Sequence, residues 1–227
     1  MQTIAERLES ARTQIKDAST KAGRNANCVK LLAVSKKKPV SDITQAYACG
    51  QRLFGENYVQ EGVEKIHALA NLPDIEWHMI GPLQSNKTRL VAENFAWVHT
   101  IDRLKIAQRL NDQRPSSLPP LNVCIQLNLD DEASKAGIQA HQIDELYQQL
   151  VTLPNLCVRG FMAIPDPTRN DDQRLQTLAQ LQQLFEQYRT SSANFDTLSV
   201  GMSGDLDDAI AHGSTMVRIG TAIFGQR

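Results

Sequence analysis

Apolar residues near the amino terminus recur with the spacing of a helix. The stripe consists of Ile4, Leu8, Ala11, Ile15, Ala18 and Ala22. Alternating steps of four and three residues place all of these side chains on one face of an α-helix. Gly23 follows the stripe, and glycine commonly ends helices because it adopts the left-handed conformation easily. The pattern therefore predicts a helix over about residues 2–23.

From residue 28 onward, short apolar, β-branched segments alternate with helical patterns. The segments begin near Val29, Arg52, Ile75, Ala96, Leu121, Leu156, Phe195 and Thr215. The clearest helical stripe between them consists of Leu175, Leu178, Leu181, Phe185 and Tyr188. Helix-start signals follow predicted strands at Pro39–Asp42 and Ser203–Asp205, and Gln113–Pro120 is a predicted loop. Eight strands thus alternate with helices at about 25 residues per unit.

Strands that are separated by helices pair in parallel, which leaves two α/β architectures. One is a closed (β/α)8 TIM barrel, and the other is an open doubly wound sheet. The open sheet would suit a nucleotide site, but neither G-x-G-x-x-G nor G-x-x-x-x-G-K-[ST] follows any predicted strand. We therefore expect a parallel eight-stranded TIM barrel over about residues 28–227, preceded by the extra N-terminal helix. The whole chain, residues 1–227, is predicted to be one domain.

Composition and charge exclude several classes of protein. The 227 residues are 41% hydrophobic and 5% aromatic with a net charge of -1, unlike a disordered or fibrous chain. No apolar run is long enough to span a bilayer, and the first 22 residues lack the apolar core of a signal peptide. Residues 1–38 hold nine basic and three acidic side chains, too few for a nucleic-acid surface but enough to favour one small anion. We expect a cytoplasmic protein that binds neither nucleic acid nor membrane.

Cysteine and histidine spacing gives no sign of a metal site. The four cysteines are Cys28, Cys49, Cys124 and Cys157. They form no C-x-x-C pair, which favours reduced, buried thiols over disulfides or zinc ligands. His78 and His99 are lone histidines, which we interpret as satisfied core or rim residues. The sequence also lacks H-E-x-x-H and G-x-S-x-G, so neither a metal hydrolase nor a serine nucleophile is expected.

Lys36 is the first candidate for chemistry. It follows an apolar strand, and alternation along that strand places Leu32, Val34 and Lys36 on one face. If this face lines the barrel interior, the amine of Lys36 points into the mouth, where TIM barrels carry their active sites. A single lysine before a loop is usually just solvated, but the neighbouring Lys37 and Lys38 favour a neutral amine, which imine formation needs.

The last two predicted strands are followed by a candidate anion site. Strand seven leads into Ser203-Gly204-Asp205, and strand eight leads into Gly220-Thr221. Glycines let backbone N–H groups approach an anion, and helix N-termini direct unpaired donors at it. Phosphate sites of TIM barrels commonly lie after strands seven and eight. Either segment alone would be an ordinary turn, but together they predict phosphate binding.

Six segments together resemble a known family. They are Leu32–Lys36, Phe54–Glu61, His78–Lys87, Gly160–Ile164, Ser199–Asp205 and Val217–Gly225. In this order they resemble the pyridoxal phosphate homeostasis proteins (YggS type). The resemblance implies a barrel of the alanine racemase N-terminal kind that carries pyridoxal 5′-phosphate (PLP).

The resemblance also implies the cofactor contacts. They are Lys36 for the Schiff base, Ser203, Gly220 and Thr221 for the phosphate, Arg218 facing the pyridine nitrogen, and Asn57 beside the ring. Gly204 stands where the family more often has Asp, which leaves only the backbone as a donor there.

An arginine beside the pyridine nitrogen implies weak catalysis. Its permanent charge disfavours the protonated ring that acts as the electron sink of PLP enzymes. Racemases of this type add a tyrosine base from a separate β-domain, which we expect this chain to lack, so that only a barrel tyrosine such as Tyr58 could replace it. The resemblance therefore implies a non-catalytic carrier, expected to be monomeric, that stores PLP or delivers it to PLP-requiring apoenzymes. A PLP-dependent amino-acid racemase and a Schiff-base aldolase without PLP remain alternatives.

Overall fold

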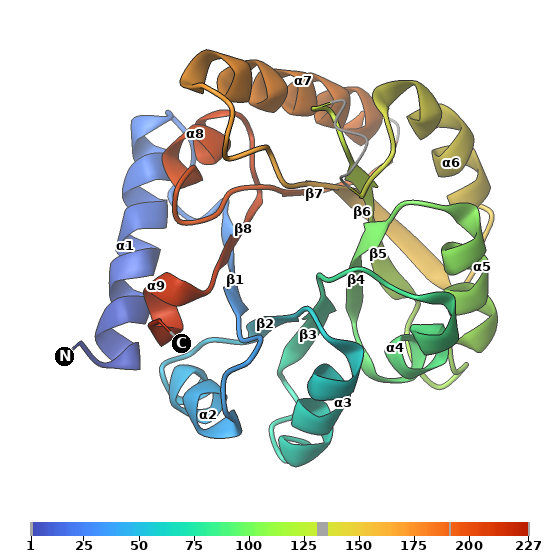
Figure 1. Cartoon of the computed structure of the whole chain (residues 1–227), viewed down its shortest axis with the longest axis horizontal. Coiled ribbons are helices and arrows are strands. Elements are labelled where there is room, and N and C mark those ends of the chain that lie inside the picture. Colours follow the sequence, from blue (N-terminus) through green and yellow to red (C-terminus); the bar gives the residue numbers. More distant parts are fainter. Residues whose placement is uncertain (1, 131–135, 191, 227) are drawn as a thin grey trace.

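The computed structural model describes residues 2–130, 136–190 and 192–226, and its strands form a closed barrel (Figure 1). The strands are β1 (Lys30–Val34), β2 (Leu53–Glu56), β3 (Glu76–Met79), β4 (Trp97–Ile101), β5 (Leu121–Leu127), β6 (Leu156–Ala163), β7 (Thr197–Ser199) and β8 (Met216–Ile219). Each pairs in parallel with its neighbours in the chain, and β8 pairs with β1. The predicted parallel eight-stranded TIM barrel is confirmed.

Helices surround the ring of strands (Figure 1). They are α1 (Ile4–Lys21), α2 (Val40–Ala48), α3 (Val59–Ala68), α4 (Thr88–Asn94), α5 (Leu104–Gln113), α6 (Ile143–Leu150), α7 (Asp171–Arg189), α8 (Leu206–Ala211) and α9 (Thr221–Phe224), with short 3-10 helices η1 (Ser85–Lys87) and η2 (Ala140–Gln142). Every predicted strand begins within two residues of its expected position. The predicted loop at Gln113–Pro120 is present, although Gln113 itself still belongs to α5.

The N-terminal helix forms as its apolar stripe predicts. Thr3 and Glu6 form a capping box at its start, which satisfies backbone N–H groups that lack partners in the first turn. Leu8, Ala11 and Ile15 are buried. The helix ends at Lys21, slightly before the predicted end, because Gly23 turns the chain with a φ of +69°. In Figure 1, α1 lies outside the barrel alongside α8 and α9.

The barrel has two kinds of core. Between strands and helices the packing is apolar, with Phe54, Phe161 and Leu198 completely buried. Inside the ring of strands the filling is mixed, because Trp97, Cys124 and Met162 form a separate small cluster next to polar side chains. All four cysteines are free thiols, as expected, but only Cys124 is buried, and burial raises its pKa; Cys28, Cys49 and Cys157 are partly exposed. Within the described residues, no helix is long and apolar enough to cross a membrane.

Two histidines belong to the polar filling inside the ring of strands. His78 on β3 and His99 on β4 are fully buried, and their rings hydrogen-bond to each other at 2.9 Å. This confirms their interpretation as satisfied core residues. Burial lowers the pKa of His99 well below its usual 6.5, and it lowers that of His78 against the opposing effect of Glu76. Both rings are therefore neutral in the folded protein.

Acid is predicted to destabilise the fold through these two histidines. Because the pKa of each ring is lower in the folded chain than in the unfolded one, the unfolded state binds more protons as the pH falls below about 6.5. The free energy of unfolding should thus be highest above this pH and fall on acidification by up to about 1.4 kcal/mol per pH unit for each histidine. Urea denaturation between about pH 7.5 and 5.5 measures this slope.

His99→Gln should flatten the slope, whereas His67→Gln, at an exposed position on α3, should retain it. A free energy of unfolding that stays constant over this pH range would contradict the neutral, buried state of both rings.

Candidate functional site

The pairing of β1 with β8 joins the two halves of the candidate site. Leu32 pairs with Arg218 and Ala33 with Ile219, so the two strands end side by side. A Cβ on Gly220 would lie only 3.2 Å from the carbonyl oxygen of Val34, which shows how closely the two segments approach. The segment that carries Lys36 therefore borders the segment that carries Gly220.

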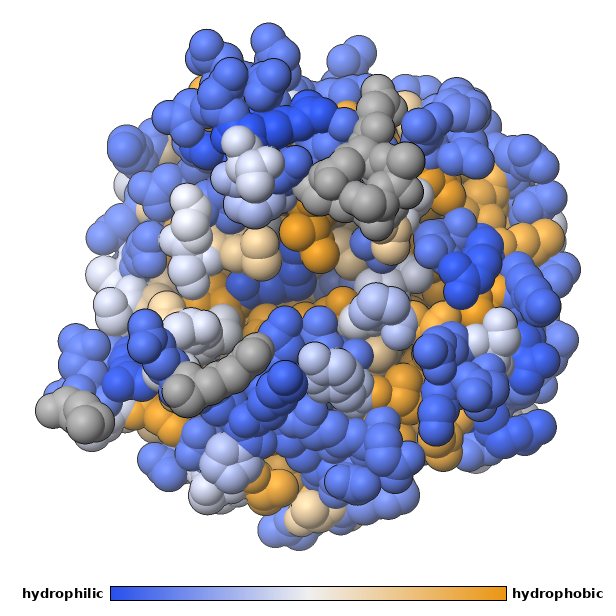
Figure 2. Space-filling model, in the orientation of Figure 1, coloured by the Kyte–Doolittle hydropathy of each residue, from blue (hydrophilic) through white to orange (hydrophobic). Residues whose placement is uncertain are grey.

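All the predicted site residues follow or occupy strands that meet at one end of the barrel, which we call the mouth. Lys36 lies two residues beyond β1, Asn57 directly after β2, Ser203 in the loop after β7, Arg218 within β8, Gly220 directly after it, and Thr221 at the start of α9. The carboxyl ends of parallel strands form one rim, which is where TIM barrels place their active sites. Viewed along the barrel, the surface is hollowed at its centre, and hydrophilic and hydrophobic residues both line the hollow (Figure 2).

The three consecutive lysines after β1 have different environments. Lys38 Nζ donates to the carbonyl oxygens of Phe224, Gly225 and Gln226, and so anchors the loop to the end of α9. Lys37 Nζ lies 5.6 Å from the centre of the Tyr58 ring. Lys36 is half-buried, and within the described residues its Nζ has no hydrogen-bond or ion-pair partner. Lys36 is thus the lysine of this run whose amine is left for a ligand.

A buried ionic cluster holds the backbone on the amino-terminal side of Lys36. Lys65 Nζ, on α3, donates to the carbonyl oxygen of Ser35 at 2.7 Å and to Glu56 Oε1 at 2.8 Å. Ser35 Oγ donates to the same carboxylate oxygen at 2.6 Å. Burial raises the pKa of Glu56, while the hydrogen bonds from Lys65 and Ser35 oppose that rise. The cluster fixes the residue that directly precedes Lys36.

The same cluster reaches the residue that follows Lys36. Glu61 accepts hydrogen bonds from Lys65 Nζ at 2.7 Å and from the backbone N–H of Lys37. Lys37 has a φ of +60°, a left-handed conformation that is unfavourable for a side chain other than glycine or asparagine. Residues held in such conformations commonly occur at ligand sites. Lys36 is therefore held from both sides by one network.

Sequence reasoning missed this cluster. Lys65 and Glu61 are one helical turn apart, which in a sequence resembles an ordinary surface ion pair. The side chain of Lys65 is only 7% exposed because it also contacts the fully buried carboxylate of Glu56, whereas Glu61 is 26% exposed at the edge of the cluster. The sequence signal for the cluster was Glu56, a glutamate at the end of the otherwise apolar strand β2.

The loops after β7 and β8 present free backbone donors. Among the described residues, the N–H groups of Ser203, Gly204, Thr221 and Ala222 donate to no protein acceptor. Asp205 does not compete for them, because its Oδ1 accepts from the backbone N–H of Met202. Several unpaired N–H groups at adjacent loops provide the kind of cradle that binds phosphate.

Arg218 lies beneath these loops and is held by main-chain oxygens. Its Nη1 donates to the carbonyl oxygen of Ser199 at 2.6 Å and to Ser199 Oγ at 2.9 Å, and its Nη2 donates to the carbonyl oxygen of Ala163 at 2.9 Å. Its Nε–H has no acceptor within the described part of the chain. Burial lowers the pKa of Arg218 to about 10, which still leaves it charged at neutral pH. Two charged N–H donors, the Nε–H and the second N–H of Nη2, therefore remain for a ligand.

Asn57, directly after β2, contributes an unpaired acceptor at the mouth. Its Oδ1 is buried without a hydrogen-bond partner, and buried polar atoms without partners are uncommon. It lines a cavity of about 260 Å³ together with Ile80, Gln126 and Ala163. Gly81 makes this geometry possible, because a Cβ there would lie 2.1 Å from the carbonyl oxygen of Asn57.

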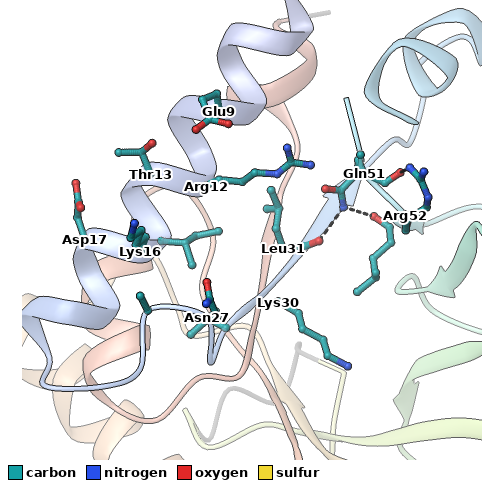
Figure 3. A pocket seen from close by; sticks show the side chains of 15 residues that line it. Glu9, Arg12, Thr13, Lys16, Asp17, Asn27, Lys30, Leu31, Gln51 and Arg52 are labelled. Atoms are coloured by element: carbon teal, nitrogen blue, oxygen red, sulfur yellow. Dashed lines mark hydrogen bonds between the residues drawn. The ribbon is translucent and has the colours of Figure 1, made fainter. Parts of the chain in front are cut away.

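A second cavity, of about 670 Å³, lies at the other end of the barrel between α1 and the starts of β1 and β2 (Figure 3). Its charged lining is of both signs, with Arg12 and Lys16 beside Glu9 and Asp17. The side-chain amide of Gln51 donates both of its N–H groups to the carbonyl oxygens of Leu31 and Leu53. This cavity does not combine charge of one sign with free donors, as the mouth does. Within the described residues there is also no cluster of His, Cys, Asp and Glu that could hold a metal ion.

Comparisons with known proteins show the family to which the chain belongs. A family model described as alanine racemase, N-terminal domain, matches residues 7–227. The pyridoxal phosphate homeostasis protein of Escherichia coli K12 is 56% identical over 229 residues, covering 100% of this chain and 98% of that protein. The structure of PipY from Synechococcus elongatus PCC7942 with PLP bound has a TM-score of 0.85 at 36% identity, covering 98% of this chain and 100% of PipY.

A more distant similarity concerns the fold alone. An alanine racemase structure from Corynebacterium glutamicum has a TM-score of 0.66 at 17% identity. The match covers 97% of this chain but 61% of the racemase, so this barrel corresponds to part of the longer enzyme.

Removal of the Lys65 amine is predicted to destabilise the fold strongly. Lys65→Met leaves the buried carboxylate of Glu56 without its cation, and breaking a buried ion pair in this way costs about 3–5 kcal/mol. Chemical denaturation measures the loss. Lys105→Met, at an exposed position on α5, is the matched control and should change the free energy of unfolding by less than about 0.5 kcal/mol. Equal stability of the two variants would contradict the role of the cluster.

Proposed function

The chain belongs to the pyridoxal phosphate homeostasis proteins of the alanine racemase N-terminal domain family, and on that premise we propose that its mouth binds PLP as a Schiff base on Lys36. The observation that carries the proposal is the free amine of Lys36, held at the mouth while Lys38 and Lys65 are engaged elsewhere. An unprotonated lysine amine can form an imine with the aldehyde of PLP. PipY, a family member of known structure, is described with PLP bound.

The remaining site residues fit the other groups of the cofactor. The free N–H groups around Ser203 and Thr221, with Gly220 between β8 and α9, suit the phosphate. Arg218 Nε suits the pyridine nitrogen, and Asn57 suits a polar substituent of the ring. Gly204 supplies only its backbone N–H, and nothing lies within 4 Å of where its Cβ would be, so no side chain replaces the family's usual Asp.

We further propose that the protein carries PLP without turnover. PLP supplies an electron sink to the enzymes that use it, and this sink depends on a protonated pyridine nitrogen. A guanidinium only donates hydrogen bonds, so a ring nitrogen facing Arg218 must act as the acceptor and stay unprotonated. The arrangement favours holding the cofactor over activating it.

A racemase, the alternative function, would need a second base across from Lys36. Of the four tyrosines, all of which lie in the described ranges, Tyr47 and Tyr188 donate to aspartates, and Tyr147 packs against aromatic rings of the outer core. Tyr58 lies at the mouth but is 49% exposed, with the charged amine of Lys37 beside its ring. No feature of Tyr58 directs its hydroxyl toward Lys36. The aldolase alternative would use Lys36 but leave the phosphate cradle without a role.

The proposed role is storage of PLP or its delivery to PLP-requiring apoenzymes by a cytoplasmic monomer. We propose that the whole chain, residues 1–227, is one PLP-binding domain with α1 packed on the barrel. The reactive aldehyde is then masked by Lys36 until an acceptor takes it.

The Schiff base is tested by reduction and peptide mapping. Purified protein with PLP should show a visible absorption band that borohydride removes, and the modified peptide should carry the label on Lys36. Lys36→Ala should lose both the band and the label. Lys37→Asn, which retains a residue suited to the left-handed conformation, should keep both. A label on Lys37 or Lys38 in the native protein would refute the assignment, and borohydride trapping of a carbonyl substrate without PLP would favour the aldolase.

The non-catalytic role is tested with amino-acid substrates. Protein loaded with PLP should convert L-amino acids to their D forms no faster than free PLP does at the same concentration. Chiral chromatography of a panel that includes L-alanine measures this. Sustained conversion in proportion to protein concentration, lost in Lys36→Ala, would establish the racemase instead.

A further inference from the structure

A chain of buried hydrogen bonds crosses the barrel interior beneath Arg218. Arg218 Nη1 lies 2.9 Å from Ser199 Oγ, which lies 3.0 Å from His99 Nδ1. The other ring nitrogen of His99, Nε2, lies 2.9 Å from His78 Nδ1. The last link joins His78 Nε2 to Glu76 Oε1 at 3.0 Å. Ser199, His78 and His99 are 0% exposed. Glu76 begins β3 at the opposite end of the barrel, where its side chain is 38% exposed. The chain thus connects the mouth with the far end.

The carboxylate end of the chain determines the direction of the hydrogen bonds. A guanidinium only donates, and a carboxylate only accepts. Ser199 Oγ accepts from Arg218, and its single proton is free to go to His99 Nδ1. A neutral His99 then carries its proton on Nε2 and donates to His78. His78 in turn carries its proton on Nε2 and donates to Glu76.

The reverse direction conflicts with Glu76. It would place protons on Nδ1 of both histidines and leave the unprotonated Nε2 of His78 facing Glu76 Oε1, which requires a protonated carboxyl. Burial opposes ionisation of Glu76, but the hydrogen bond from His78 and the charge of Lys30 hold its pKa below the usual value. Trp97 fixes the ring plane of His78, because the two rings stack at 5.1 Å with an interplanar angle of 14°.

Arg218 needs such support because no carboxylate touches it. Within the described residues it forms no ion pair, and Asp205 acts on it only at a distance. A buried cation without a counter-ion is costly. Polarised hydrogen bonds that end on a carboxylate strengthen one another and offset part of that cost.

We propose that Glu76, His78, His99 and Ser199 are positioning residues that hold the Arg218 guanidinium in its ligand-facing orientation through one directional hydrogen-bond chain. The proposal rests on the proposed function for the ligand that Arg218 faces. The arrangement of protons within the chain does not depend on that ligand.

The proton positions can be measured directly. Long-range 1H–15N correlation spectra of the full chain, labelled at histidine and assigned with His78→Gln and His99→Gln, report which ring nitrogen carries the proton. We expect Nε2–H on both His78 and His99, with and without PLP. A proton on Nδ1 of either ring overturns the chain, whatever the outcome for PLP binding.

Variants test whether the chain positions Arg218. Ser199→Ala removes one link while the bonds of Arg218 to two carbonyl oxygens remain, and it should raise the Kd for PLP about tenfold. Glu76→Leu should mix the histidine tautomers and weaken PLP binding. Glu76→Gln keeps an oxygen acceptor and should retain the wild-type tautomers and bind PLP more tightly than Glu76→Leu. Glu93→Leu is the matched control, because Glu93 is similarly exposed, at 39%, on the surface of α4.

The outcomes separate the two proposals. Altered tautomers in Glu76→Leu or Ser199→Ala together with unchanged PLP affinity and spectrum overturn the positioning role. Native protein that has both Nε2–H tautomers but binds no PLP refutes the proposed function and leaves the directional chain intact. Should Glu76→Leu fail to fold, Ser199→Ala decides the question alone, since it removes only one buried oxygen.

Discussion

The pairing of β8 with β1 is the constraint on which the site depends. It places Leu32 opposite Arg218 and brings Gly220 against Val34, although these residues come from opposite ends of the chain. In an open sheet the first and last strands need not meet, and the lysine after β1 need not lie beside the loop that carries Gly220. Closure of the ring therefore places two ordinary segments, a lysine after a strand and a glycine-containing turn, side by side at one candidate site.

Much of this could be predicted from the sequence because it depends on local periodicity. Apolar β-branched runs marked all eight strands, and the position of Lys36 at the end of the first one placed it at the mouth. The positions of Ser203 and Gly220 followed in the same way from the ends of the last two strands. Their roles toward PLP came from family resemblance, since no local pattern identifies a ring nitrogen or its partner.

The supporting network could not be predicted, because its members are distant in sequence and ordinary in type. Ser199 and His99 are 100 residues apart, and nothing near either of them indicates the other. Lys65 on α3 belongs to a helix whose charges suggest a solvated face. Whether such a lysine is buried depends on how closely α3 packs against the end of β1, which is a tertiary property. The end of α1 moved for a local reason instead, because the left-handed Gly23 turns the chain after Lys21.

Arg218 also has an architectural role that follows from where its hydrogen bonds end. The β7–β8 ladder consists of the single pair Ser199–Met216, the shortest register in the ring. The guanidinium donates to oxygens of Ala163 and Ser199, and so links β8 to the ends of β6 and β7 where the strand pairing is shortest. Truncating that side chain would weaken the wall of the barrel and also remove the proposed ligand contact. Loss of function after such a truncation could therefore have either cause. Only replacements that keep the hydrogen bonds to β6 and β7 can distinguish loss of stability from loss of ligand binding.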